Sequence, residues 1–280
     1  MTETVGLIGT GAMGSALLTR INLAGRVAQA YDVNPEAVAR AAEAGAKPAA
    51  SPAEAASGVE TVHVFVRTDE EVRDVMVGAN GVLEGAGEGT LVLLHSTIMP
   101  ATTRRMAAAA GGRGVTAIDA PVTAIPRVVA AGDAVWLVGG PDEAVARARP
   151  QLEALGKAVW HFGPVGAGNV AKIAKNFINA AERVVLAETL NMVEAGGLDL
   201  ATFLEMAVAE DGGSTLSRWE RAFELVGNHA RPRPASNLMN KDVGLAARLA
   251  EVEGVPTPLA HIAADTAAVW VAGWEAEKAR

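Results

Sequence analysis

The sequence predicts an α/β protein in which a doubly wound, mostly parallel sheet is followed by one long helix and an all-α C-terminal domain. Up to residue 162, short apolar runs alternate with alanine-rich helical stretches, and after Gly168 helical spacing continues without a strand pattern. Half of the 280 residues are hydrophobic but only 4% are aromatic. That composition suits parallel α/β layers and packed helices better than a β-sandwich.

Short apolar runs in the first part of the chain predict the strands. They are Val5–Ile8, Ala28–Tyr31, Thr61–Val66, Leu91–Leu94, Val115–Ile118 and Val135–Val138, with a further strand-like run at Ala158–Phe162. Helical patterns lie between them, as at Glu36–Ala44, Glu70–Met76 and Thr102–Ala109. Because strands that alternate with helices form βαβ units, this order predicts a parallel sheet.

The second part of the chain reads as helical throughout. Asn169–Glu194 contains neither Pro nor Gly and keeps apolar residues at helical spacing, which predicts a helix of roughly 40 Å. Four further helical patterns follow, at Leu200–Glu210, Thr215–Leu225, Leu238–Glu253 and Leu259–Ala272. We therefore expect an α/β domain over residues 1–163 and an all-helical domain over residues 164–280 that begins with the long helix.

Charge and composition exclude several classes of partner. The net charge of −8 argues against nucleic acid or an anionic membrane surface, since phosphate contacts need clustered Lys and Arg. There is no cysteine, so disulfides and thiolate metal sites are excluded. The five histidines form no ligand-spaced cluster, so no metal site is expected. With neither a signal-peptide pattern nor an apolar run of about 20 residues, the expected location is the cytoplasm.

The motif Gly9-Thr10-Gly11-Ala12-Met13-Gly14 indicates a dinucleotide site. In such a motif the first glycine makes a tight turn, the second lets a pyrophosphate approach the backbone, and the third allows close packing of helix on strand. In a protein with 30 glycines a bare motif can also be an ordinary turn. Here it follows an apolar strand and opens a helix, which favours a Rossmann-type dinucleotide-binding domain.

The end of the second strand favours NAD over NADP. Asp32 follows Tyr31, and an acidic residue there can accept both ribose hydroxyls of the adenosine and would repel a 2′-phosphate. Neither Val33 nor Asn34 is the arginine that an NADP site would use. The alternative is that Asp32 is a solvated turn residue.

Lys172 and Asn176 are candidate catalytic residues. They are four residues apart, so they share one face of the long helix, which starts at the predicted domain junction, where ligands tend to bind. Partial desolvation there would lower the pKa of a lysine and suit it to proton transfer. Taken alone, the pair also fits a solvated Lys beside a helical Asn.

Five motifs in the same order resemble the β-hydroxyacid dehydrogenase family, which includes 3-hydroxyisobutyrate dehydrogenase. They are the glycine turn, Ser96-Thr97 followed by Pro100, Asp119-Ala120-Pro121-Val122, the run from Gly163 to Asn176, and Lys241-Asp242. The resemblance implies that Lys172 is the general acid/base and that Asn176 holds the substrate. It further implies that Ser96 and Thr97 lie near the nicotinamide ribose and that Lys241 reaches the cofactor side of the cleft. Asp242 is expected to brace local backbone.

Two segments depart from the family pattern. Thr123-Ala124-Ile125 stands where relatives have Ser-Gly-Gly, so the loop expected to bind the substrate is altered. Val66-Arg67-Thr68 stands where relatives have Leu-Pro before a small residue, at the expected cofactor rim. Arg67 would either lie over the cofactor or point to solvent. These departures leave the hydride and proton machinery intact and the substrate open.

The resemblance implies an NAD-dependent oxidoreductase that moves hydride to or from the hydroxyl-bearing carbon of a small hydroxy acid, or reduces the matching semialdehyde. An NADPH-dependent imine reductase is the alternative enzyme; such proteins usually lack a lysine at position 172 and carry basic residues after the second strand. A non-catalytic NAD-binding sensor or scaffold would have no chemical need for Lys172 with Asn176. A homodimer or higher oligomer is expected from the habit of the family.

Overall fold

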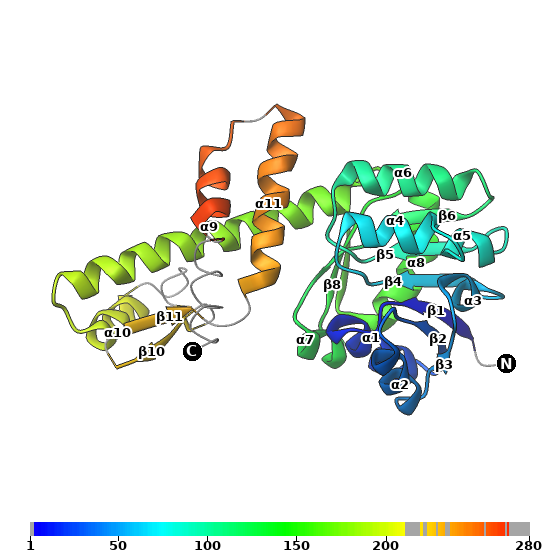
Figure 1. The fold of residues 1–280 in the computed structure, drawn as a ribbon, viewed down its shortest axis with the longest axis horizontal. Coiled ribbons are helices and arrows are strands. Elements are labelled where there is room, and N and C mark those ends of the chain that lie inside the picture. The colour runs from blue at the N-terminus through cyan, green and yellow to red at the C-terminus, as the bar shows by residue number, and fades with distance from the viewer. Residues whose placement is uncertain are drawn as a thin grey trace. The chain divides into compact units, whose positions relative to one another are not determined.

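The computed structural model describes residues 3–210, 219–220, 223–227, 229–232, 236–254, 256–266 and 268. The chain divides into two compact units, Met1–Lys172 and Ile173–Arg280. The predicted fold class is confirmed: the first unit is built on a parallel sheet with helices on both faces, and the second is mainly helical (Figure 1).

The main sheet of the first unit has six parallel strands in the order β3-β2-β1-β4-β5-β6. Their bounds are β1 Thr4–Ile8, β2 Val27–Tyr31, β3 Lys47–Pro48, β4 Thr61–Val64, β5 Leu91–Leu94 and β6 Thr116–Asp119. The strand order reverses between β1 and β4, and in open α/β sheets ligands bind outside the carboxyl ends of the strands at such a point.

Eight helices belong to the first unit, and they cover both faces of this sheet (Figure 1). They are α1 Ala12–Leu23, α2 Pro35–Glu43, α3 Pro52–Ala56, α4 Asp69–Val77, α5 Val82–Gly85, α6 Pro100–Gly111, α7 Pro126–Ala131 and α8 Asp142–Leu155. Successive residues of a strand point to opposite faces of the sheet and so pack in different hydrophobic clusters. Leu7 and Leu93 pack with α1 and α8, whereas Ile8 packs with α4 and α6. Both faces of the sheet are therefore shielded from solvent, which explains why the strands are continuous apolar runs.

A second sheet of three strands accompanies the main one. It contains β7 (Val122–Thr123), β8 (Val135–Val138) and β9 (Ala158–His161), with β7 antiparallel and β9 parallel to β8. The apolar runs at 135–138 and 158–162 were expected as strands, and they are. Periodicity could not show that they form a sheet of their own, because it carries no information on pairing.

The second unit contains most of α9 (Ala167–Ala195), then α10 (Leu200–Glu210) and α11 (Ser236–Glu253). The long helix and the patterns at 200–210 and 238–253 are confirmed. The pattern at 259–272 is helical at 258–266 and at 268, and residues 267 and 269–272 lie outside the described residues.

One expectation for the second unit is wrong. The helix predicted over Thr215–Leu225 includes part of an antiparallel hairpin, β10 (Phe223–Val226) with β11 (His229–Pro232), so strands do return after Gly168. Phe223 is buried and Glu224 is exposed, the alternation of a strand, and Gly227 takes a positive φ of 61° at the turn. Four residues are too few for this alternation to outweigh a helical spacing. Residues 211–218 lie outside the described part.

No helix within the described residues is long and apolar enough to cross a membrane.

Two histidines lie in the core of the first unit. His63 Nδ1 is 3.0 Å from His95 Nε2, and His95 Nδ1 is 2.8 Å from the carbonyl oxygen of Ala120. Because a carbonyl only accepts, His95 carries its proton on Nδ1 and accepts at Nε2 from His63. Burial lowers the pKa of His95 to about 4. Burial, followed by the neighbouring His95, lowers the pKa of His63 well below its ordinary value. Both rings are therefore neutral at pH 7.

The histidine pair is expected to make folding sensitive to acid. The unfolded chain takes up protons on these histidines near its ordinary pKa of about 6.5, whereas the folded chain resists protonation down to a lower pH. The free energy of unfolding should therefore fall as the pH drops from about 6.5 toward 4, by up to about 1.4 kcal/mol per pH unit for each histidine. Urea unfolding at several pH values measures this slope.

A pair of variants separates the contribution of His63 and His95 to this pH dependence from that of the other titrating groups. His63→Leu removes one of the two buried rings and should make the slope shallower. Thr90→Val, at a buried position without a titratable group, should leave the slope unchanged. Equal slopes for wild type and His63→Leu would contradict the account.

Candidate functional site

The glycine turn adopts the geometry of an anion-binding loop. Gly9 has a positive φ of 91°, and a Cβ there would lie 2.5 Å from the carbonyl oxygen of Phe65. A Cβ on Gly14 would overlap the carbonyl of Gly9, whereas one on Gly11 would meet nothing within 4 Å. The fold thus demands glycine at 9 and 14, and position 11 borders open space. The first amides of α1, which begins at Ala12 after a cap without a side-chain bond, are available to a phosphate there.

Asp32 is held in place by two backbone amides. Its Oδ2 accepts from the amide of Thr10 at 2.7 Å, and its Oδ1 accepts from the amide of Asn34 at 2.9 Å. The carboxylate is half-buried and bridges the glycine turn to the start of α2. Asp32 is therefore more than a solvated turn residue. Each carboxylate oxygen keeps a further lone pair that can accept a hydroxyl.

A pocket with a volume of about 560 Å³ opens beside this carboxylate at the carboxyl ends of β1, β2 and β4. It gathers six of the residues predicted to bind the cofactor, namely Gly9, Gly11, Asp32, Val33, Val66 and Arg67. Its size and concave form suit the adenosine half of a dinucleotide.

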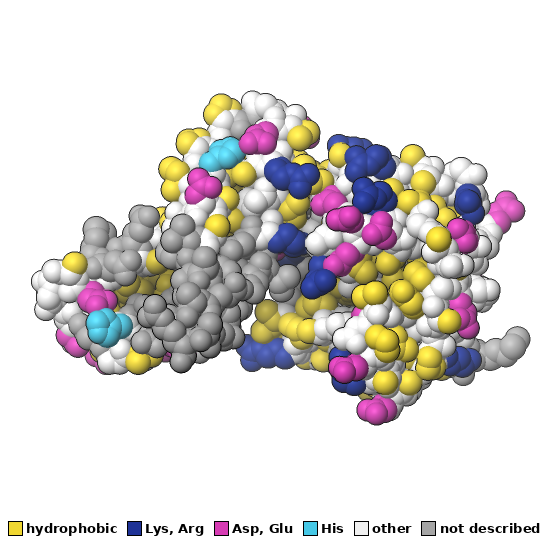
Figure 2. Space-filling model, viewed as in Figure 1, with side chains coloured by type: hydrophobic (Ala, Val, Ile, Leu, Met, Phe, Trp, Pro, Cys, Tyr) yellow, Lys and Arg dark blue, Asp and Glu magenta, His cyan; other side chains and the backbone are white. Residues whose placement is uncertain are grey.

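The walls of this pocket carry more negative than positive charge. Asp32, Glu71 and Asp74 line it against Arg40 and Arg67, so the lining has three carboxylates and two guanidinium groups. In the space-filling view, acidic side chains gather over α4, with basic side chains beside them (Figure 2). A pocket of this balance disfavours an extra phosphate.

Two further predicted cofactor residues take part in hydrogen bonds of the fold. The hydroxyl of Ser96 donates to the carbonyl oxygen of Val66 at 2.7 Å, which joins the loops that follow β5 and β4. The Thr68 hydroxyl accepts from the amide of Glu71 at 3.1 Å and caps α4. The structure brings Val66 and Ser96 together, and the role of residues 66–68 and Ser96 at a cofactor rim stays a prediction.

Asp119 anchors the first turn of α9, a role that the sequence did not reveal. Its Oδ1 accepts from the amide of Gly166 at 2.7 Å and its Oδ2 from the amide of Asn169 at 2.8 Å. Burial raises the pKa of Asp119 to about 6, against the opposing effect of these amides. A carboxylate aimed at the amide end of a helix also interacts favourably with the helix dipole.

Asn169 ties the same turn to a second segment. Its side-chain oxygen accepts from the amide of Ile98 at 3.1 Å, and its amide nitrogen donates to the hydroxyl of Thr103 at 3.1 Å. Asn169 is fully buried, and Lys172, three residues later, is 9% exposed. The turn that carries Lys172 is therefore fixed both to the end of β6 and to the region around the start of α6.

Asn176, one helical turn beyond Lys172, bonds within the second unit. Its side-chain nitrogen donates to Asp242 Oδ2 at 2.7 Å, and the Lys241 ammonium lies 3.2 Å from Asp242 Oδ1, close enough for an ion pair but without hydrogen-bond geometry. Partial burial lowers the pKa of Lys175, whose side chain is otherwise exposed, although the nearby Asp242 opposes this. Asp242, expected only to brace backbone, therefore orients the side chain of a candidate catalytic residue.

The altered substrate loop forms a strand end and a helix start. Thr123 ends β7, Ala124 packs against the main core, and Ile125 is 50% exposed immediately before α7. Pro126 takes the first position of α7, which suits its fixed φ. Binding of a substrate by Thr123, Ala124 and Ile125 stays a prediction. Within the described residues, no three His, Asp or Glu side chains gather as a metal site would require.

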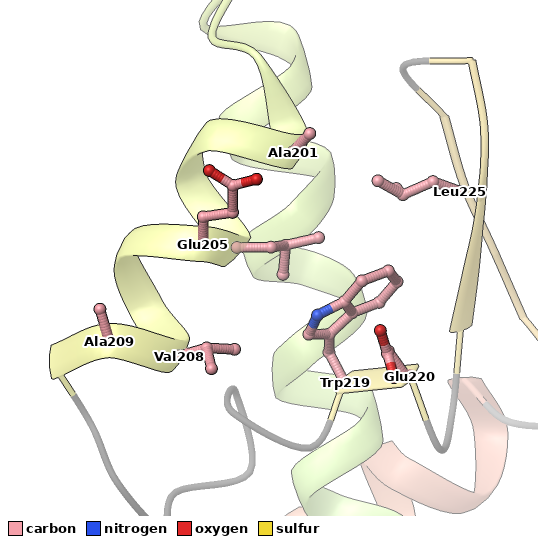
Figure 3. A pocket seen from close by; sticks show the side chains of 8 residues that line it. Ala201, Glu205, Val208, Ala209, Trp219, Glu220 and Leu225 are labelled. Atoms are coloured by element: carbon pink, nitrogen blue, oxygen red, sulfur yellow. The ribbon is translucent and has the colours of Figure 1, made fainter.

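A second pocket, with a volume of about 430 Å³, lies in the second unit between α10 and β10. Figure 3 shows the Trp219 indole reaching into it between Val208 on α10 and Leu225 on β10. Trp219 is also partly buried against the core cluster of this unit. None of the predicted site residues lines this pocket.

Comparison with known proteins identifies the class. Residues 4–163 match the family model of the NAD-binding domain of 6-phosphogluconate dehydrogenase. Residues 166–279 match the NAD-binding model of NADP-dependent 3-hydroxyisobutyrate dehydrogenase. With the glycine turn and its pocket, these matches define an oxidoreductase that uses a nicotinamide cofactor.

Individual relatives identify the family of oxidoreductases to which the chain belongs. The chain is 34% identical to an NAD-dependent L-serine dehydrogenase of Pseudomonas aeruginosa, over 93% of this chain and 90% of the relative. It is 34% identical to a 3-hydroxyisobutyrate dehydrogenase of the same organism (92% and 89% covered) and 32% identical to a 3-sulfolactaldehyde reductase of Escherichia coli (91% and 86% covered). The chain belongs to the β-hydroxyacid dehydrogenase family, as the motifs predicted.

Solved structures agree with this assignment. The 3-hydroxyisobutyrate dehydrogenase of Mycobacterium tuberculosis, solved with L-serine, superposes with a TM-score of 0.85 at 29% identity and covers 97% of this chain and 94% of that one. An imine reductase from Myxococcus stipitatus superposes with a TM-score of 0.68 at 21% identity, covering 98% of this chain and 95% of that one, and at that identity it shows the shared fold alone.

Proposed function

We propose that this enzyme is an NAD-dependent dehydrogenase of a small hydroxy acid, or, in reverse, a reductase of the matching semialdehyde. The observation that carries the proposal is the anchored first turn of α9, which holds a buried lysine one helical turn from an asparagine. Asp119 and Asn169, which are both buried, fix the turn that carries this lysine. The names of the relatives support the substrate class.

Lys172 and Asn176 divide the work of proton transfer and orientation. A bound nicotinamide supplies the acceptor for the hydride that leaves the hydroxyl-bearing carbon. Lys172 in its neutral form takes the hydroxyl proton, so that a carbonyl remains on the substrate and the ammonium form of Lys172 results. In the reverse direction the ammonium returns the proton to the new alkoxide. Asn176, oriented by Asp242, holds the substrate oxygen in reach of Lys172.

The cofactor proposed is NAD. Asp32 is fixed by the amides of Thr10 and Asn34 with lone pairs left for ribose hydroxyls, and the excess of carboxylates in the pocket opposes a 2′-phosphate. Ser96, Thr97 and Thr68 would border the nicotinamide half, and Lys241 would contribute from the second unit. For Ser96 and Thr68 these assignments rest on the family motifs and on the hydrogen bonds described above. For Thr97 and Lys241 they rest on the family motifs alone.

Asp32→Ala should weaken NADH binding roughly tenfold or more and reduce its advantage over NADPH, since the hydrogen bonds lost involve a charged acceptor. Fluorescence titration with NADH and with NADPH measures both affinities. Asp133→Ala, at an exposed aspartate outside the pocket, serves as the matched control. An unaltered ratio of the two affinities in Asp32→Ala would show that Asp32 does not select the cofactor.

The substrate class is tested by a panel chosen from the relatives. L-Serine, 3-hydroxyisobutyrate and the alcohol corresponding to 3-sulfolactaldehyde are each offered with NAD⁺ and with NADP⁺, and the reduced nicotinamide is followed by absorbance. We expect oxidation of at least one of these small acids with NAD⁺. The hydroxyl of Thr123 and the amides of Ala124 and Ile125 are proposed to bind the acid group. Binding of NADH without turnover of any small acid would point to a non-catalytic role.

We also propose that the second unit pairs two copies of the chain. Large apolar side chains are exposed on α9 (Ile178, Val185) and α10 (Met206, Val208). A homodimer would bury such side chains, and pairing of two copies about a two-fold axis is the commonest form of oligomer.

A further inference from the structure

Arg67 and Glu71 form a closely hydrogen-bonded pair on the rim of the adenosine pocket. The Arg67 guanidinium donates to Glu71 Oε1 through Nη2 at 2.8 Å and through Nε at 3.2 Å, and the Arg67 amide donates to Oε2 at 2.7 Å. Both oxygens of the carboxylate are thus engaged by one residue. The cap from Thr68 to the amide of Glu71 fixes the start of α4 and so the direction of this side chain.

The pair lies within electrostatic reach of the proposed ribose-binding carboxylate. The pKa of Arg67 is raised by Glu71 first and, more weakly, by Asp32. Burial acts to raise the pKa of Glu71, but the bonds from Arg67 outweigh it and leave the pKa lowered, so Glu71 is ionised at pH 7. Arg40 is the other arginine that lines the pocket. Its Nη1 lies 3.9 Å from Glu36 Oε2, which is beyond hydrogen-bond distance, so this contact is looser than the one between Arg67 and Glu71.

A 2′-phosphate on the adenosine ribose would need a cation at this rim. Arginine is well suited to that task, because its planar fork binds phosphate oxygens in pairs. Here the fork of Arg67 already faces a carboxylate that the fold holds in position. Turning it toward a phosphate would break two hydrogen bonds and leave the charge of Glu71 next to that phosphate.

Building on the NAD site proposed above, we infer that Glu71 is a specificity residue for the cofactor. It withholds the Arg67 guanidinium from a 2′-phosphate and adds its own negative charge to that of Asp32. Rejection of NADP then depends on Glu71 acting through Arg67, and not on Asp32 alone. Without Glu71, the same arginine would become a ligand for NADP.

The test uses two probes that contain only the adenosine half. Calorimetry compares the affinity for adenosine 2′,5′-bisphosphate with that for adenosine 5′-monophosphate, so it needs no turnover. Glu71→Ala should raise the affinity ratio in favour of the bisphosphate roughly tenfold, the effect of about one charge-assisted hydrogen bond. Glu71→Gln, which keeps the shape and loses the charge, should change the ratio in the same direction by less.

Two controls separate the action of Arg67 from simple charge removal. In the double variant Arg67→Ala/Glu71→Ala most of the gain should disappear. Asp74→Asn also removes a carboxylate from the pocket lining, but Asp74 lies 3.8 Å from Arg73 Nε, so its effect on the ratio should be much smaller. Thermal melting of each variant shows whether the fold is kept.

The outcomes are distinct. A gain in Glu71→Ala that is lost in the double variant supports the inference. An unchanged ratio in both Glu71 variants, or an equal gain in Asp74→Asn, overturns the inference and leaves the proposed function intact. If the wild type binds neither adenosine 5′-monophosphate nor NADH, the proposed function fails and the inference with it.

Discussion

Lys172→Ala is expected to lower kcat roughly a thousandfold while NADH affinity stays close to that of the wild type. A positioned general acid/base contributes about 10² to 10⁴ to the rate. Lys172 stands on a helical turn that Asp119 and Asn169 hold in place, so the position of its amine is well defined. Steady-state kinetics with the best acid of the panel gives kcat, and fluorescence titration gives the affinity for NADH.

A second lysine of α9 provides the control. Lys175 is exposed on the same helix, so Lys175→Ala should retain most of the wild-type turnover. An exogenous primary amine should restore part of the turnover of Lys172→Ala, because it can replace the missing proton acceptor. Near-normal kcat in Lys172→Ala would remove the lysine from the mechanism and would leave the family assignment unaffected.

Asp119→Asn is expected to cost stability and turnover together. The two oxygens of Asp119 accept from different amides, so an asparagine necessarily turns its NH₂ group toward one of these donors. An unsatisfied buried donor costs about 1 to 3 kcal/mol of unfolding free energy. Because the disturbed turn carries Lys172, kcat should fall by about tenfold or more even where the protein remains folded, as small misplacements of reacting groups are costly.

The readouts distinguish a positioning role from general destabilisation. At a temperature where Asp119→Asn is fully folded, kcat should be reduced while NADH affinity is kept, since the adenosine pocket does not include this turn. Asp133→Asn makes the same chemical change at an exposed position and should alter neither quantity. Wild-type stability and kcat in Asp119→Asn would show that the anchor of α9 is dispensable.

The local parts of the site could be predicted from the sequence. Three parts of the site each depend on a short stretch of sequence: the glycine turn, Asp32 at the end of β2, and the uninterrupted helix that carries Lys172 and Asn176. Their geometry follows from backbone rules that apply to neighbouring residues. The alternation of strands and helices likewise predicted the doubly covered sheet.

The partners that hold the site in place could not be predicted in this way. Asp119 meets Gly166 and Asn169 across 47 and 50 residues of sequence, and Asn176 meets Asp242 across 66. Periodicity carries no information about such pairings. A signal was present for Asp119, because an aspartate that ends an apolar strand needs partners when it is buried. Glu71 gave a local signal as well, since Thr68 and Glu71 have the spacing of a capping box.

Hydride transfer between the nicotinamide and the hydroxyl-bearing carbon of a small acid can be followed by isotope labelling. The enzyme is incubated with the aldehydes that correspond to the substrate panel and with NADH that carries deuterium at both C4 positions. We expect an alcohol product with one deuterium on the carbon that bears the new hydroxyl, detected by mass spectrometry. Bound NADH with no deuterated alcohol from any of the aldehydes would contradict this hydride transfer.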